Sequence, residues 1–322
     1  MSRSRSAWIA LGLKLLVTTV LLYYFVSKVR MGPLLAQIAA VKPAAALAAI
    51  GLTLLQLALG SLRWRSLSER LGVPLAPSRA LRFTLIGQFF NQLLPTAFGG
   101  DAVRAWLASS DRATLARSIR AVLCDRIVGL VALLLLISVA FLALPRPAAH
   151  SLAVHDIMRA TVVVTLLGLA VLYLLGAAAA RWLEAGRWTR ALGTLIGDVH
   201  AALFSRATSA LMFGTSVIAH LAAVGAIWLC CAGLRVELGF GAALSVLPVV
   251  VLVSMAPVSL AGWGLREGAM VVGLGTLGVG HGEALAVSVT YGLVQIAAGI
   301  PGALLWLFGP GLRRMRPVDA GE

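Results

Sequence analysis

Two arginines occur in a repeated arrangement of proline and glycine within this strongly apolar chain. The two spacings are Pro95-x4-Gly100-x3-Arg104 and Pro257-x4-Gly262-x3-Arg266. A guanidinium group is a rigid fork of donors that binds phosphate oxygens in pairs. Each arginine is therefore a candidate ligand for a lipid phosphate. The alternative role for each is to cap a helix or to pair with a carboxylate.

Small and polar residues near the two arginines complete the candidate headgroup-binding set. Its further members are Asn91, Gly99, Gly100, Gly262 and Gly264. Helices that begin after Gly100 and Gly264 would add backbone N–H donors and the positive end of a helix dipole.

Four charged residues accompany this set, namely Asp101, Asp125, Arg126 and Glu267. An unpaired charge at membrane depth is costly, so we expect the carboxylates to pair with the arginines. A counter-charge released by an anionic ligand, or a proton carrier, is the alternative. Arg126 is expected to anchor the start of a span at the interface.

The composition predicts an all-α polytopic membrane protein. The 322 residues are 60% hydrophobic and 12% charged, and several apolar runs are long enough to cross a bilayer. The net charge of +15 would suggest nucleic acid in a soluble protein. Here it fits arginines in cytoplasmic loops that face anionic lipid, so we expect no nucleic-acid partner.

About six full transmembrane helices are expected in a single membrane domain over residues 1–322. They are Leu11–Ser27, Ala44–Leu62, Ala121–Leu144, Thr161–Ala180, Ala210–Ala232 and Ala284–Phe308. The second should end at an interface with Arg63-Trp64-Arg65. Residues 181–206 have the pattern of a helix lying in the membrane interface.

Two shorter apolar regions are expected to form re-entrant helical hairpins. Phe83–Leu94 is too short to span, and Pro95 should end its helix, which makes Phe83–Ser109 the first hairpin. The second comprises Phe240–Ala256, a break at Pro257, and Ala269–Val279. The basic loops then place both termini in the cytoplasm. Residues of about 44–144 and 210–308 would form inverted repeats whose broken helices meet near the midplane.

The sequence contains few signals for metal or cofactor chemistry. The three cysteines show neither C-x-x-C nor zinc spacing, no D-x-D occurs, and the glycine-rich stretch after Gly262 lacks G-K-[ST]. We therefore expect no metal, no cofactor and no catalytic residue. His220 is expected to be a hydrogen-bonded bundle histidine, with a proton relay as the alternative. Interhelical hydrogen bonds or a polar path are the two roles open to Gln88, Asn91, Tyr291 and Gln295.

The paired motifs resemble the lysylphosphatidylglycerol synthase transmembrane-region family of flippase-like membrane proteins. The matching residues are Asn91-x2-Leu94-Pro95-x3-Gly99-Gly100-Asp101-x2-Arg104, then Asp125-Arg126, then Pro257-x-Ser259-x2-Gly262-x-Gly264-x-Arg266-Glu267. The resemblance implies a lipid flippase or a relative of one. The chain ends at Glu322 without a soluble synthase domain, so lysyl transfer is not expected.

The function expected first is transport of an anionic or polyprenyl-linked lipid between leaflets of the cytoplasmic (inner) membrane. The alternative is a non-catalytic accessory or scaffold of hopanoid, glycolipid or isoprenoid synthesis. A membrane-embedded lipid-phosphate transferase ranks third, because that class would want a metal site and a large external loop. The expected partners are membrane lipids with anionic headgroups, and a homo-oligomer or lipid-biosynthesis partners stay open.

Overall fold

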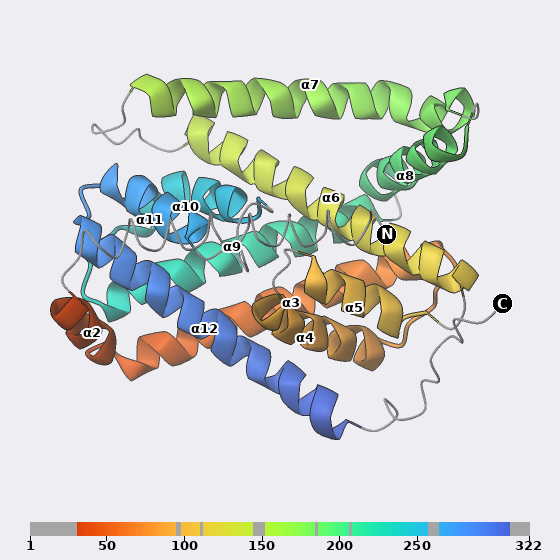
Figure 1. Ribbon diagram of the computed structural model, residues 1–322. Helices are drawn as coiled ribbons and strands as arrows, with labels where there is room; N and C mark the ends of the chain where they lie inside the picture. The colour runs from red at the N-terminus through yellow and green to blue at the C-terminus, as the bar shows by residue number, and fades with distance from the viewer. Residues whose placement is uncertain are drawn as a thin grey trace, which may run out of the picture.

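The computed structural model describes residues 31–94, 98–109, 112–143, 152–183, 186–205, 208–256 and 264–309. Every regular element within these ranges is an α-helix, as the composition predicted (Figure 1). The expected first span, Leu11–Ser27, lies outside the described residues.

Five helices in the described part of the chain are long and apolar enough to cross a membrane. They are α3 (Pro43–Arg70), α6 (Arg112–Ala143), α7 (Leu152–Trp182), α9 (Ser209–Gly233) and α12 (His281–Phe308). The helix α7 lies at the edge of the molecule and packs on α6 and α8 (Figure 1). Its leucines and valines are mostly exposed, for example Leu174 at 71%, as expected of a helix that faces lipid. The protein is therefore a polytopic membrane protein.

The six remaining described helices are shorter. They are α2 (Met31–Ala39), α4 (Pro77–Leu93), α5 (Gly99–Leu107), α8 (Arg187–Phe204), α10 (Phe240–Ser254) and α11 (Leu265–Gly275). The helix α8 falls within the segment predicted to lie in the interface. It buries Val199 and Leu203 against α6 and α9 and exposes Leu192.

Two pairs of short helices face each other across the middle of the molecule. The α4–α5 pair lies between α3 and α6 in the chain, and the α10–α11 pair lies between α9 and α12. The two helices of each pair pack against each other, and the two pairs approach the centre from opposite sides (Figure 1). Pro95 and Pro257, the expected helix breaks, lie outside the described residues. The helices nevertheless end just before them, at Leu93 and Ser254.

Several predicted boundaries were wrong. The helix α4 begins at Pro77 rather than Phe83, because Pro77 occupies the first helical turn, where proline is favoured. The helix α6 begins at Arg112, nine residues before the expected start, and it packs on α5 through Ala121 and Val122. The helix α11 covers Leu265–Gly275 because Glu267 caps its first turn.

The prediction that the second span ends at an interface with Arg63-Trp64-Arg65 was also wrong. The helix α3 continues to Arg70, and both Arg63 and Trp64 are buried within the protein. Burial of a guanidinium at this position is tolerated because Arg63 finds a carboxylate and a hydroxyl on neighbouring helices.

Close backbone contacts fix α4 in the bundle. A Cβ atom at Gly100 would overlap the carbonyl oxygen of Gly87, so α5 lies directly on α4. A Cβ at Gly302 would overlap the carbonyl oxygen of Leu85 in the same way, which brings α12 against α4. Only glycine permits such approach of one helix backbone to another.

Candidate functional site

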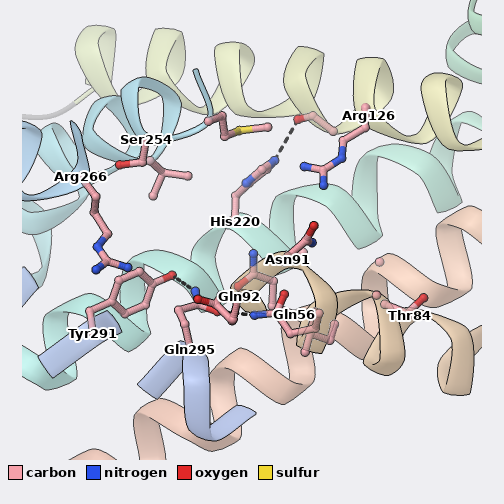
Figure 2. A pocket seen from close by; sticks show the side chains of 18 of the residues that line it. Gln56, Thr84, Asn91, Gln92, Arg126, His220, Ser254, Arg266, Tyr291 and Gln295 are labelled. Atoms are coloured by element: carbon pink, nitrogen blue, oxygen red, sulfur yellow. Dashed lines mark hydrogen bonds between the residues drawn. The ribbon is translucent and has the colours of Figure 1, made fainter. Parts of the chain in front are cut away.

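A polar cavity of about 350 Å³ lies where the two short helical pairs meet the long helices. Its walls come from α3, α4, α5, α6, α9, α10, α11 and α12. The charged and polar residues among those that line it are Gln56, Arg63, Thr84, Gln88, Asn91, Gln92, Arg104, Asp125, Arg126, His220, Ser254, Arg266, Tyr291 and Gln295. Figure 2 shows Arg126 and Arg266 entering from different helices, with His220 between them in this view. Within the hydrocarbon region of a bilayer, backbone breaks and charged side chains require such a protein-lined space.

Arg104 projects from α5 toward the long helices and is held by two carboxylates. Its Nη1 donates to Asp101 Oδ1 over 3.2 Å, and its Nη2 donates to Asp125 Oδ2 over 3.5 Å. The guanidinium carbon also lies 4.4 Å from the ring centroid of Trp64, a cation–π contact. The prediction that at least one of the carboxylates pairs with Arg104 or Arg266 is confirmed.

Asp125 on α6 connects three helices. Arg63 Nε donates to Asp125 Oδ1 over 2.7 Å, and Arg63 Nη1 donates to Ser216 Oγ on α9 over 2.9 Å. The sequence reasoning did not include Arg63 in the site. The signal was present, because Gln56, Gly60 and Arg63 recur at helical spacing and all three line the cavity.

The expectation that Arg126 anchors the start of a span at the membrane interface was wrong. Arg126 pairs with Asp101 and lines the cavity. Its side chain is 36% exposed, against 9% for Arg104 and 7% for Arg266. Among the described arginines of the cavity wall, Arg126 thus has the most exposed side chain. Asp101 is shared between Arg126 and Arg104.

The start of α5 is stabilised from within the protein. Asn91 Oδ1 accepts a hydrogen bond from Gly100 N–H over 2.9 Å, and both Gly99 and Gly100 are buried. Asn91 therefore caps the helix in addition to lining the cavity. The Gly100 amide, expected to face a ligand, is already used by Asn91.

Glu267 caps the start of α11 and accepts hydrogen bonds from three groups. They are Gly264 N–H, Arg266 Nη2 at 2.7 Å and Ser288 Oγ at 3.1 Å. Gly264 has φ +86°, a conformation that favours glycine. Its amide thus serves the cap, while Arg266 still reaches the cavity wall. Gly262 lies outside the described residues.

The charges around the cavity do not cancel. In the described ranges, four buried or half-buried guanidinium groups, Arg63, Arg104, Arg126 and Arg266, contact three carboxylates, Asp101, Asp125 and Glu267. The network therefore carries one excess positive charge. Such an excess attracts an anion into the cavity, since an uncompensated charge is costly in a low-dielectric interior.

Neutral hydrogen-bonding groups form the rest of the wall. Gln88 Nε2 donates to Gln295 Oε1 over 2.9 Å, and Gln295 Nε2 donates to Tyr291 Oη. His220 Nε2 contacts the carbonyl oxygen of Gly129 at 2.9 Å, which confirms that His220 is hydrogen-bonded within the bundle. Gln88 and Gln295 thus join α4 to α12 and line the cavity, whereas Tyr291 is bonded within α12 and lines the cavity.

A second hollow, of about 330 Å³, lies on α3, α9 and the first turn of α10. Its lining is apolar apart from the Trp228 indole, whose Nε1 donates to Leu238 O. It offers no charged group, so the central cavity is the better site for a lipid headgroup. In the part of the chain that the structure describes, no group of three His, Cys, Asp or Glu residues is placed to hold a metal ion.

The comparison with protein families agrees with the conclusion that the protein is a polytopic membrane protein. The model of the "Lysylphosphatidylglycerol synthase TM region" matches residues 11–302. No curated protein matches the chain significantly.

Proposed function

Because the chain belongs to the lysylphosphatidylglycerol synthase transmembrane-region family, we propose that it moves an anionic or polyprenyl-linked lipid between the leaflets of the cytoplasmic membrane. The observation that carries this proposal is the central cavity, whose charge network has one more guanidinium than carboxylates. Intramembrane charges that line a cavity are typical of substrate pathways. The proposal contains no covalent step.

The topology that accompanies this function has six full spans and two re-entrant hairpins, α4–α5 and α10–α11, within inverted repeats of about residues 44–144 and 210–308. The order of a long helix, a short pair and a long helix occurs twice, and the two pairs approach the centre from opposite sides (Figure 1). Broken helices that meet near the midplane are the usual architecture of a transport site. Arginines in the helical turns that flank the α3–α4 and α5–α6 connections, such as Arg70, Arg79 and Arg117, support a cytoplasmic location for that side and for both termini.

The proposed mechanism uses an exchange of partners at Asp101. In the observed state, Asp101 pairs with both Arg104 and Arg126. A lipid phosphate that enters the cavity contacts the more exposed Arg126 first and replaces Asp101 there. Asp101 retains Arg104, so neither carboxylate nor guanidinium is left alone during the exchange. Arg266, on the opposed helical pair, then provides the second phosphate contact from the other side of the cavity.

Reconstitution into proteoliposomes tests the proposal. We expect the wild-type protein to move fluorescent anionic phospholipids or polyprenyl phosphates between leaflets faster than empty liposomes. Arg126→Gln should reduce the rate at least about tenfold, and Arg126→Lys should recover part of it, because an ammonium keeps the charge but loses the fork. Arg65→Gln is the matched control, since Arg65 forms an exposed pair with Glu69 away from the cavity.

The same assay separates transport from the alternative of a non-catalytic accessory of lipid synthesis. Rates equal to those of empty liposomes for every lipid, with correctly folded protein, would favour the accessory. Normal rates in Arg126→Gln and Arg266→Gln together would leave transport standing but remove this charge network from it.

A further inference from the structure

We infer that lipid transport by this protein is coupled to protons, with His220 as the proton-binding residue of the central cavity. The anionic lipid and one proton cross the membrane together, as an electrically neutral pair. This inference rests on the proposed function and supplies its energy source. It follows from the pairing of the carboxylates, from the hydrogen bonds of the imidazole, and from the charges that surround it.

The carboxylates of the charge network are poorly suited to carry a proton, because guanidinium groups hold each of them. The pairs are Asp101 with Arg104 and Arg126, Asp125 with Arg63 and Arg104, and Glu267 with Arg266. Protonation of any of these carboxylates would leave a buried guanidinium without its counter-charge, which is costly. Among the described residues that line the cavity, this leaves His220 as the group whose charge can change near neutral pH.

The imidazole of His220 has one nitrogen available for a second proton. Three buried atoms of the lining residues lack a hydrogen-bond partner among the described residues, namely Thr84 Oγ1, Arg104 Nε and His220 Nδ1. Of these, only Nδ1 can take up a proton near neutral pH. Because Nε2 contacts the carbonyl oxygen of Gly129, Nε2 carries the proton of the neutral ring, and Nδ1 keeps a free lone pair. A second proton therefore adds at Nδ1 without loss of the Gly129 contact.

Arg63 and His220 share two neighbours, which brings the charge network close to the imidazole. Arg63 Nη1 donates to Ser216 Oγ, one helical turn before His220 on α9. Arg63 Nη2 lies 3.2 Å from the position that a Cβ atom of Gly129 would take, and the Gly129 carbonyl contacts the imidazole. The charge of the network therefore acts on His220 at close range.

The other charged or titratable groups that share the cavity wall with His220 come from α5, α6, α11 and α12. They are Arg104, Asp125, Arg126, Arg266 and Tyr291. The helix α10 has no charged residue, and α8 packs on α9 near Met212, about two turns before His220, without contributing to the wall. On α9 itself, Cys230 and Cys231 lie in the apolar core more than two turns further along. In the described network, four guanidinium groups therefore face three carboxylates, and the excess is one positive charge.

An anion that enters the cavity changes which form of His220 is stable. In the empty cavity, a protonated imidazole adds to the positive excess and is disfavoured, so His220 is neutral. Figure 2 shows His220 between Arg126 and Arg266, the two guanidinium groups proposed to receive the lipid phosphate. A phosphate held there cancels the excess, so a proton binds more readily when lipid is present. By linkage, the proton strengthens lipid binding by the same factor. The proton comes from water on the entry side and returns to water on the exit side.

Movement of a fluorescent phosphatidylglycerol in proteoliposomes tests the coupling, because its phosphodiester keeps one negative charge near neutral pH. A transmembrane difference of about one pH unit should drive net movement toward the alkaline side, with an asymmetry approaching about tenfold. A potassium diffusion potential without a pH difference should drive none, because the lipid and the proton form a neutral pair. Movement that follows the potential, or that follows neither gradient, would overturn the inference and leave transport intact.

Proton uptake on binding supplies a readout that does not depend on transport. Short-chain phosphatidylglycerol added to the detergent-solubilised protein in weakly buffered solution should raise the pH, and its affinity should rise about tenfold from about pH 8 to about pH 6. If no lipid moves but binding takes up a proton, the proposed transport fails and the coupled site stands. Binding without proton uptake overturns the inference. If the lipid neither binds nor moves, both proposals are overturned.

Two substitutions fix the two charge states of His220. His220→Gln can keep a donor to Gly129 but takes up no proton, so lipid affinity should stay low at every pH and movement should no longer follow the pH difference. His220→Arg carries a permanent charge, so lipid affinity should stay high at every pH. His200→Gln is the matched control, because His200 packs against Gly176 on α7 and lies outside the cavity wall. It should behave as the wild type. An unchanged pH dependence in His220→Gln would contradict the role of His220.

Discussion

Arg63 Nε donates to Asp125 Oδ1 over 2.7 Å and thereby joins α3 to α6 between positions 62 residues apart in the chain. Asp125 also accepts a hydrogen bond from Arg104 on α5, so one carboxylate of α6 connects this helix to α3 and α5. This contact fixes the wall of the central cavity on which Arg104 and Arg126 lie.

Loss of this carboxylate should be strongly destabilising. Asp125→Asn leaves Arg63 and Arg104 with weaker compensation in a buried site, and we expect a cost of about 3–5 kcal/mol in the free energy of unfolding. The measurement is reversible unfolding in mixed micelles. Glu69→Gln, which removes the exposed partner of Arg65, should cost less than about 1 kcal/mol. Similar costs for the two variants would show that Asp125 does not support the wall.

A methyl group at Gly100 should separate α5 from α4. Gly100→Ala would place Cβ against the Gly87 carbonyl, a backbone atom that cannot rotate away, so we expect destabilisation of about 1–3 kcal/mol and reduced transport. Gly51→Ala on α3 is the control, because a Cβ there meets nothing within 4 Å. That control should be neutral or slightly stabilising. The same unfolding assay, combined with lipid transport, compares them.

Substitution of the two capping glutamates, Glu267 and Glu283, should lower the free energy of unfolding by very different amounts. Glu267 caps α11 from a buried position and pairs with Arg266, whereas Glu283 caps α12 at an exposed one. We expect Glu267→Gln to cost about 3–5 kcal/mol, and Glu283→Gln about 0.3–1 kcal/mol. Thermal unfolding of both variants checks the difference. A Glu267→Gln protein as stable as Glu283→Gln would mean that the Arg266 pair contributes little.

The proposed topology can be tested at two exposed positions. Cysteines introduced at Ser78, in the first turn of α4, and at Gly280, before α12, should react with an impermeant maleimide from opposite sides of the membrane. Ser78→Cys is expected to react from the cytoplasm and Gly280→Cys from outside. The native cysteines Cys124, Cys230 and Cys231 are buried and give little background. Reaction of both introduced cysteines from one side would refute the opposed hairpins.

Asp198 on α8 should make stability depend on pH. Burial raises the pKa of this carboxyl above its ordinary 3.8, and Arg120 opposes the shift only in part. Because the pKa is higher in the folded state, the unfolded chain loses this proton at a lower pH than the folded protein does. The free energy of unfolding therefore falls as the pH rises from 3.8 through the folded-state pKa of Asp198. Asp198→Asn should therefore be more stable than the wild type at pH 7 and similar to it below pH 3.8. Unfolding midpoints across this range measure the difference, and a pH-independent difference would contradict it.

The sequence by itself determined the membrane class, the α-helical architecture and the ion pairing of the hairpin charges. In a long apolar run within lipid, the backbone satisfies its hydrogen bonds by forming a helix. A carboxylate near a buried arginine pairs with it because an unpaired charge within the membrane is costly. The family resemblance rested on motifs that lie close together in the chain, and the match over residues 11–302 confirms it.

The tertiary structure decided which groups share one site. Arg63 follows an apolar run and, read along the sequence, resembles an interfacial anchor. It becomes a buried partner of Asp125 because α3 continues past it and packs beside α6 and α9. Likewise, the candidate amides of Gly100 and Gly264 are used by Asn91 and Glu267. Local spacing sets which face of a helix a side chain occupies, whereas the packing of helices distant in sequence decides what that face meets.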